Sequence, residues 1–390
     1  MKKYRELTLA LALAVLSLQV MSVSAFAAPA TGTNEPITIG LLQDISGPTS
    51  VLGNQVARGF TFAVEKINRE GGMEGHPIKL ITYDYKGNIQ EAVNAYNRMT
   101  TEGCSVVMGP PVSNVSAALT PITDEAKVPL LSLAGAPYLY KDAEGKATKY
   151  TFLCQINMSD YGYTMASYGI NELGFKKFGL LYDQTNAYCV SLIEPFKEYA
   201  AEHDAEIVAE EIFITGDLDF TPHLQKIMDA GPDAIFIPTY TQQNVIAAQN
   251  IAQMKLDIPV LGTLDHCYPF NKVLNNPTAA NNIYMADNIS YKDPALETLR
   301  KPYMEATGEE PTNKCYLGWD AAHIIKEAVR ITGKIDPESI VTGLEQVKDL
   351  QLTTGSFSID PATHMPINLP MVIMKLEQGE YVELGSYKYK

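Results

Sequence analysis

The chain has 390 residues, 46% of them hydrophobic, and a formal net charge of -15 at pH 7. A chain of this length exceeds what a single hydrophobic core usually organises, which predicts two lobes that need no disulfides to fold. The negative charge argues against nucleic acid and anionic lipid as partners, because both are negatively charged.

Residues 1–27 have the features of a cleaved export signal. Three basic residues within the first five come before an apolar stretch from Leu7 to Val20, and residues 25–27 have the small-x-small form of a signal peptidase site. The apolar stretch is shorter than the roughly 20 residues that a bilayer span needs, and no later stretch is longer. We therefore expect a soluble, extracytoplasmic protein. No cysteine follows the signal closely, so no lipid anchor is expected there.

From Ile37 the sequence alternates strands with helices. The first predicted helix carries Val56, Phe60, Ala63 and Ile67 on one face, which is helical spacing. Residues 138–149 are polar and are predicted to form a surface excursion. The predicted strands of this half are 37–42, 78–83, 105–108 and 129–133, and the predicted helices are 51–69, 90–102 and 115–126.

The same alternation restarts at Ser159, which predicts a second sheet. Predicted helices cover 161–173, 190–203, 220–230, 242–254, 294–307, 316–331 and 337–346; predicted strands cover 178–182, 206–211, 234–238, 260–261, 283–289, 355–359, 371–376 and 381–384. Apolar strands alternating with helices indicate an α/β fold with parallel sheets covered on both faces. Ligand sites in such folds lie beyond the carboxyl ends of the strands.

The cysteines are widely spaced and odd in number, so at least one is unpaired within a monomer. They are Cys104, Cys154, Cys189, Cys267 and Cys315. Because no Cys-x-x-Cys pair or Cys/His ligand spacing occurs, we interpret them as small buried apolar residues rather than metal ligands. No metal or other cofactor is expected.

Several segments share their order and spacing with one family. They are SGPTSVLG (46–53), AVEKINREGGMEGHPI (63–78), the Asp84-containing YDYKGN, MGPPVSN (108–114), EAKVPLLS (125–132), MSD (158–160), GPDAIF (231–236) and LGWDAA (317–322). Together they resemble the leucine/isoleucine/valine-binding branch of the extracytoplasmic solute-binding proteins of ABC importers.

The resemblance implies the type I periplasmic-binding-protein fold, in which two Rossmann-like lobes are joined by a three-crossing hinge and close around a ligand. It places residues 36–157 and 289–360 in lobe 1, and residues 158–288 and 361–390 in lobe 2. The crossings are expected near Asn157, Ile289 and Asp360.

The resemblance also implies which residues hold the carboxylate of an amino acid ligand. Ser113, at a helix start where backbone N–H groups favour an anion, matches the family's carboxylate-binding serine. An ordinary N-cap is the alternative role. Ala134-Gly135-Ala136 matches the segment that offers a backbone amide and a threonine hydroxyl, and Ala136 stands where that threonine is usual, so one hydroxyl is missing.

For the ligand ammonium, Asp160 matches the acidic position at the entrance to lobe 2, where a carboxylate pairs with a cation. Its alternative role is the N-cap of the helix expected from Tyr161. Tyr188 and Tyr240 match family tyrosines whose rings cover an aliphatic side chain and present a π face to an ammonium. Core packing is the alternative for each tyrosine.

The loop after strand 260–261 departs from the family pattern. An acidic residue usually helps to bind the amine there, yet the simplest register places Leu264 at that position and Asp265 one residue later. If Asp265 is displaced, a ligand with a weaker or absent amine becomes possible. Leu52, at a position that often carries an aromatic ring, adds an apolar wall.

We therefore expect a receptor that captures an apolar, branched-chain-like amino acid or a related small carboxylate and passes it to a membrane permease. It is expected to act as a monomer in the periplasm or an equivalent extracytoplasmic space. The alternatives are a sensor of the same fold that feeds a regulator, and a binder of aromatic or aliphatic acids. A secreted enzyme is disfavoured, because the sequence has no Gly-x-Ser-x-Gly, phosphate-loop, His-Glu-x-x-His or Gly-x-Gly-x-x-Gly motif.

Overall fold

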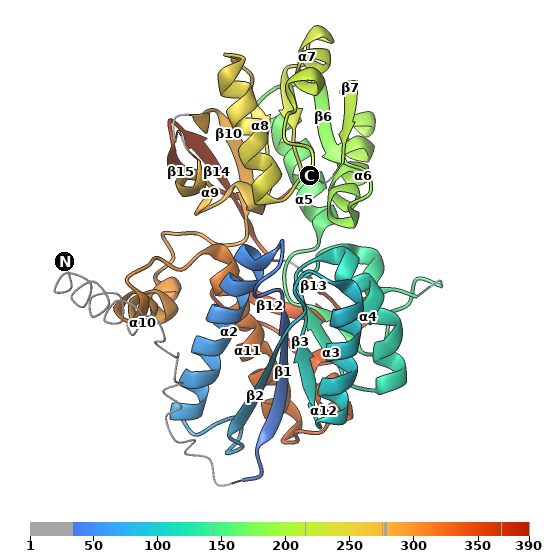
Figure 1. The fold of residues 1–390 in the computed structure, drawn as a ribbon, viewed down its shortest axis with the longest axis vertical. Helices are drawn as coiled ribbons and strands as arrows, with labels where there is room; N and C mark the ends of the chain where they lie inside the picture. Colours follow the sequence, from blue (N-terminus) through green and yellow to red (C-terminus); the bar gives the residue numbers. More distant parts are fainter. Residues whose placement is uncertain are drawn as a thin grey trace, which may run out of the picture.

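The structure is a computed structural model that describes residues 34–142, 144–214, 216–274, 276, 279–367 and 369–389. The expected export signal, residues 1–27, lies outside this part. The chain forms two lobes, one above the other in Figure 1, with connecting segments between them. Among the described residues, no helix combines the length and the apolar character needed to cross a membrane.

The first lobe, the lower one in Figure 1, contains a parallel five-stranded sheet in the order β2-β1-β3-β4-β5. Its strands are β1 (Ile37–Gln43), β2 (Ile78–Asp84), β3 (Val106–Met108), β4 (Leu130–Ser132) and β5 (Thr151–Leu153). The first four lie within one residue of the predicted bounds at each end. The fifth strand, β5, was not predicted from the sequence.

Helices cover both faces of this sheet, and much of its core lies between β1 and the helices α2, α11 and α12. The helices of this lobe are α2 (Ser50–Arg69), α3 (Ile89–Thr101), α4 (Ser113–Ala126), η1 (Pro137–Tyr140), η4 (Pro294–Leu296), α10 (Glu297–Thr307), α11 (Asn313–Thr332) and α12 (Pro337–Glu345). A small antiparallel sheet of β11 (Leu350–Leu352), β12 (Gly355–Asp360) and β13 (Met365–Ile367) adjoins them.

The second lobe contains a seven-stranded sheet in the order β15-β14-β10-β9-β8-β6-β7. The five strands from β10 to β7 are parallel, and β14 and β15 add antiparallel strands at one edge. Its strands are β6 (Lys177–Asp183), β7 (Glu206–Phe213), β8 (Ala234–Phe236), β9 (Val260–Leu261), β10 (Ile283–Asp287), β14 (Met371–Glu377) and β15 (Glu380–Tyr387). Its helices are α5 (Met158–Asn171), α6 (Ala187–Glu202), α7 (Thr221–Asp229), α8 (Thr241–Gln253), η2 (Leu264–His266) and α9 (Phe270–Val273).

The chain passes between the lobes three times, after β5, after β10 and after β13. The third passage comes later than the sequence predicted, because β13 pairs with β12 and Met365 packs in a core cluster with Ala134 and Leu153 of the first lobe. The chain therefore stays in the first lobe beyond Asp360 and enters the second between Ile367 and Met371.

Two expectations about local structure have different outcomes. All five cysteines are buried, as predicted, and all five are free, whereas the sequence required only one to be unpaired. The surface excursion expected over 138–149 is not exposed throughout: Tyr138 is exposed, but Leu139 and Tyr140 are buried, and the Tyr140 hydroxyl donates a hydrogen bond to the Ala134 carbonyl. The polar residues that follow Tyr140 supply the rest of the exposed part.

Two glycines allow α2 and α11 to pack closely. A Cβ atom added to Gly59 would lie 1.8 Å from the Cys315 carbonyl oxygen, and one added to Gly318 would lie 2.2 Å from the Val56 carbonyl oxygen. Both obstacles are backbone atoms, which cannot rotate away. This packing fixes where the first residues of α11 lie relative to those of α2.

We predict that Gly59→Ala lowers the free energy of unfolding by about 2 kcal/mol, although alanine is the better helix former, because the added methyl forces α2 and α11 apart. Urea unfolding followed by circular dichroism measures the change. Glu65→Ala, an exposed substitution in the same helix, is the control and should change stability by less than about 0.5 kcal/mol. An unfolding midpoint of Gly59→Ala at or above that of the wild type would contradict the prediction.

Candidate functional site

A cavity lies between the two lobes, at the edges where the parallel strands of both sheets end. Its wall in the first lobe follows β3, β4 and β5, and its wall in the second follows β6, β8 and β9, with Leu52 and Lys314 added from the first turns of α2 and α11. The lining residues are Leu52, Pro111, Leu133, Gly135, Gln155, Tyr188, Tyr240, Leu264, Asp265 and Lys314. Convergent strand ends from two sheets are the expected place for a ligand.

Hydrogen bonds join the lobes around this cavity. The Asn114 side chain accepts from the Ala187 backbone N–H at 3.1 Å and donates to the Thr185 carbonyl at 3.5 Å. Asn313 donates to the Leu264 carbonyl at 3.1 Å. The enclosed volume is about 20 Å³, comparable with the space that one water molecule needs. A ligand the size of an amino acid therefore requires the lobes or the lining side chains to move.

Ser113 is the first residue of α4, and its side chain is completely buried. The N-cap position belongs to Val112, and within the described residues the Ser113 hydroxyl has no hydrogen-bond partner. The alternative role of Ser113 as an N-cap is therefore not realised. Burial raises the pKa of the Tyr240 phenol, which belongs to the second lobe. Ser113 itself is not among the residues that line the cavity.

The segment after β4 reaches the cavity through its glycine. Gly135 lines the cavity, while Ala134 and Ala136 are fully buried and are not among the lining residues. The Ala134 N–H donates to the Ser132 hydroxyl at 3.0 Å. This amide is thus already hydrogen-bonded within the first lobe.

The structure places Asp160 outside the cavity that Leu52, Tyr188, Tyr240, Leu264 and Asp265 line. Its carboxylate accepts hydrogen bonds from the Asn157 side chain at 2.8 Å and the Tyr389 hydroxyl at 3.3 Å. It lines a separate cavity with Met365 and Lys388. The helix begins at Met158 with Asn157 as its N-cap, so Asp160 is not the N-cap either. The structure thus does not bring Asp160 together with Ser113 around one ligand.

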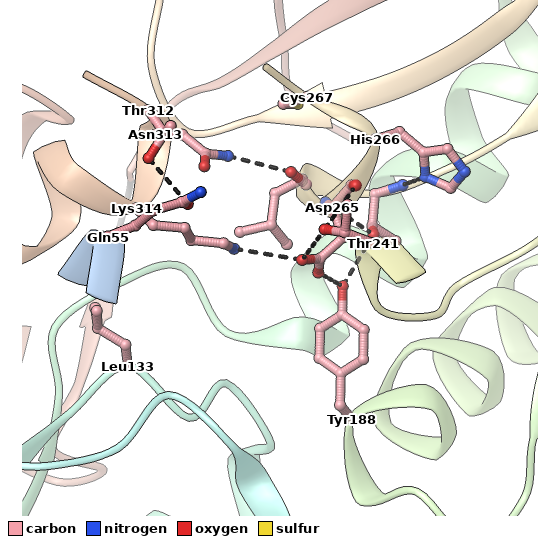
Figure 2. A network of polar contacts seen from close by, with 12 residues as sticks. Gln55, Leu133, Tyr188, Thr241, Asp265, His266, Cys267, Thr312, Asn313 and Lys314 are labelled. Atoms are coloured by element: carbon pink, nitrogen blue, oxygen red, sulfur yellow. Dashed lines mark hydrogen bonds and ion pairs between the residues drawn. The ribbon is translucent and has the colours of Figure 1, made fainter. Parts of the chain in front are cut away.

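Asp265 is the carboxylate that reaches the cavity from the second lobe. The 3-10 turn η2 carries both Leu264 and Asp265 into the lining, so the one-residue displacement in the sequence does not remove Asp265 from the site. Its Oδ2 accepts from the Tyr188 hydroxyl at 2.6 Å, and its Oδ1 accepts from Thr241 Oγ1 at 3.4 Å and lies 3.9 Å from Lys314 Nζ. Figure 2 shows Tyr188 and Lys314 approaching this carboxylate from different elements.

Tyr188 and Tyr240 form a stacked pair on one side of the cavity. Their ring centroids lie 4.7 Å apart with an interplanar angle of 14°. Burial raises the pKa of Tyr188, and the negative charge of Asp265 adds to that effect, so its hydroxyl remains a donor. The Tyr240 hydroxyl has no hydrogen-bond partner in the described part of the chain. The two rings therefore form an apolar surface, and the Tyr240 hydroxyl on it is available to hydrogen-bond a ligand.

Gln155 and Lys314 also line the cavity, and neither was expected there from the sequence. Gln155 follows β5, a strand that was not predicted, and its side-chain nitrogen donates to the Leu133 carbonyl. Lys314 lies in the first turn of α11, three residues before the LGWDAA segment. A lysine at the start of an amphipathic helix usually faces solvent. Nothing in the sequence around Lys314 indicates that its side chain is buried.

His266 follows Asp265 and stabilises the same turn. Its ring lies 3.3 Å from both the Thr263 backbone nitrogen and the Asn244 side-chain nitrogen, and burial lowers its pKa to about 3. A histidine whose folded pKa lies below its unfolded value of about 6.5 binds fewer protons when folded. Its contribution to stability is therefore present above pH 6.5 and is lost as the pH falls toward 3.

We predict that His266 makes the free energy of unfolding about 2 kcal/mol lower at pH 5 than at pH 7. The reason is that at pH 5 the unfolded state binds a proton on this histidine and the folded state does not. His266→Gln, which retains a hydrogen-bond acceptor, should remove this part of the pH dependence. Urea titrations of both proteins at the two pH values measure the difference, in which all other titrating groups cancel. Equal pH dependence in the two proteins would contradict the prediction.

Known proteins resemble this chain over most of its length. A family model described as periplasmic binding protein matches residues 36–380. The curated relatives include Leu/Ile/Val-binding protein homolog 3 of Brucella melitensis, 23% identical over 88% of this chain and 93% of the relative. They also include the leucine-, isoleucine-, valine-, threonine- and alanine-binding protein of Pseudomonas aeruginosa, 21% identical over 87% of this chain and 90% of the relative.

Solved structures share the fold. The branched-chain amino acid transporter substrate-binding protein LivJ of Streptococcus pneumoniae, in complex with isoleucine, is 27% identical with a TM-score of 0.81 and covers 91% of this chain and 100% of its own. An ABC transporter solute-binding protein from R. palustris, in complex with benzoate, is 20% identical with a TM-score of 0.81 and covers 91% of this chain and 97% of its own.

Proposed function

This chain belongs to the periplasmic binding protein family, and we propose that it is the extracytoplasmic substrate-binding receptor of an ABC importer. It captures an apolar amino acid or a related small carboxylate between its lobes and releases it unchanged. One observation carries this proposal: strand ends of both sheets converge on one cavity that combines apolar walls with a buried carboxylate and unpaired polar atoms. Relatives named for leucine, isoleucine and valine binding support the ligand class.

In this proposal the first lobe binds the ligand carboxylate. Ser113 provides a buried hydroxyl that has no partner among the described residues, and it lies at the start of α4, a helix of 14 residues. Free N–H groups and the helix dipole favour an anion at such an end. The Tyr240 hydroxyl, also unpaired among the described residues, is a second donor from the opposite lobe.

Apolar side chains from both lobes bind the body of the ligand. Leu52 and Leu133 come from the first lobe, Leu264 from the second, and the stacked rings of Tyr188 and Tyr240 complete the wall. Burying a leucine-sized side chain contributes roughly 1.5–3 kcal/mol. The carboxylate of Asp265 lines the same cavity, whereas Asp160, to which the sequence assigned the role toward a ligand cation, lines another.

Separation of the lobes would admit the ligand, and the hydrogen bonds from Asn114 and Asn313 to the second lobe would form on closure. Hinge closure of two lobes around a ligand is a known way to present a bound state to a partner. We propose that this partner is the membrane permease of the importer and that the receptor acts as a monomer. Residues 1–27 would direct export to the periplasm or an equivalent space and then be removed.

We predict that a thermal-shift screen of apolar amino acids and small carboxylates raises the unfolding midpoint for at least one compound. The reason is that a ligand bound by the folded state alone stabilises it. Isothermal titration should then give a dissociation constant in the micromolar range or below, which corresponds to roughly -8 kcal/mol or better. The absence of a shift with every compound of both classes would overturn the proposed function, as would chemical turnover of the bound compound.

We predict that Ser113→Ala weakens binding of the best compound by about tenfold to a hundredfold, because a charged acceptor loses a hydrogen bond worth about 1.5–3 kcal/mol. Protein stability should hardly change, since this hydroxyl has no partner within the described part of the chain. Ser356→Ala, at an exposed serine of β12, is the control and should leave the affinity unchanged. An unaltered dissociation constant in Ser113→Ala would show that the carboxylate binds elsewhere.

A further inference from the structure

Lys314 occupies a position that two physical effects disfavour. It is the second residue of α11, and the first turn of a helix carries partial positive charge that repels a cation. Its side chain is only 11% exposed, and burial disfavours a charged ammonium. Such a placement requires a compensating negative charge, and Asp265, whose side chain is 4% exposed, supplies it at 3.9 Å.

The start of α11 is held in place against the second lobe. Thr312 caps the helix, with Oγ1 accepting from the Cys315 N–H at 3.3 Å, and Asn313 donates to the Leu264 carbonyl and lies 3.4 Å from Asp287 Oδ1. Figure 2 shows this end of the helix directed toward Asp265. Lys314 is therefore positioned by fixed backbone, and its ammonium lies beside Asp265 in the cavity wall.

Asp265 has little capacity left for another donor. One oxygen accepts from Tyr188, and the other lies near Thr241 and Lys314. Among the residues that line the cavity, Asp265 is the one acidic residue and Lys314 the one basic residue, so a group of opposite charge already lies beside the carboxylate. Gln155 Oε1, in the same wall, has no hydrogen-bond partner among the described residues, but it is neutral and cannot replace a carboxylate as the partner of an ammonium.

We propose that Lys314 supplies, from within the chain, the cation that pairs with Asp265, so that the cavity selects small apolar carboxylic acids over the amino acids with the same side chain. This inference rests on the proposed function and narrows its ligand class. An α-ammonium that reached Asp265 would lie close to the Lys314 ammonium, and two like charges in a site with little water repel strongly. An acid without the amine avoids that repulsion and keeps every contact in the carboxylate and apolar parts of the site.

The test uses the full chain and two matched ligand pairs that differ in the amine alone: leucine with 4-methylpentanoate, and phenylalanine with 3-phenylpropanoate. Isothermal titration gives the ratio of dissociation constants within each pair. We expect the wild type to bind at least one of the acids ten times or more tightly than its amino acid. A wild-type protein that binds the amino acid of each pair more tightly overturns the inference but leaves the proposed function standing.

Lys314→Met, which keeps length and apolar bulk but removes the charge, should shift the ratio at least tenfold toward the amino acid, because the ligand ammonium then replaces the missing partner of Asp265. Lys314→Arg keeps the charge and should retain the preference for the acid. Lys301→Met, at an exposed lysine of α10, is the matched control and should leave the ratio unchanged.

These outcomes separate the two proposals. An unchanged ratio in a folded Lys314→Met protein overturns the role of Lys314. If that variant does not fold, the wild-type ratio and Lys314→Arg decide, since loss of the acid preference in the arginine variant contradicts a role of charge. Failure of the wild type to bind any compound of either class, in these pairs and in the wider screen, removes the proposed function and this inference with it.

Discussion

The buried carboxylate of Asp265 is the constraint on which the site depends. Taking a carboxylate out of water costs several kcal/mol unless other groups pair with it. Here the compensating groups come from three elements, namely Tyr188 of α6, Thr241 of α8 and Lys314 of α11. Because α11 belongs to the first lobe, the pairing of this one charge links both lobes, and it also determines how much negative charge remains for a ligand.

The position of Lys314 depends in turn on packing far from the cavity. Helix α11 lies against α2 at a distance that Gly59 and Gly318 permit, and α2 itself places Leu52 in the same wall. The packing of α2 against α11 therefore fixes the positions of Leu52 and Lys314 relative to each other. The remaining lining residues follow strand ends, whose positions depend on sheet register, so helix packing and sheet pairing independently bring the parts of the cavity together.

Much of this arrangement could be predicted from the sequence, because its signals are local. Long apolar strands and amphipathic helices have clear periods, and residues just after such strands lie at one edge of a parallel sheet. The resemblance to the family, rather than these periods, placed Leu52, Tyr188, Tyr240, Leu264 and Asp265 at the site, and all five line the cavity. The strands that were missed are β5, β11 and β13, and the late third passage between the lobes follows from missing β13.

The charges of the site could not be predicted, because they depend on long-range contacts. Asp160 occupies a suitable position in the sequence, but the side chains of Asn157 and Tyr389 hold it beside another cavity, and Tyr389 is 229 residues away along the chain. Lys314 has no local signal of burial and reaches Asp265 because its helix docks across the lobes. The site therefore lacks one carboxylate that the sequence suggested and gains one ammonium that it did not. The absence of Asp160 and the presence of Lys314 both lower the attraction of the cavity for a cation. The charge that the cavity prefers in a ligand therefore depends on the tertiary structure and could not be inferred from the family-like segments of the sequence.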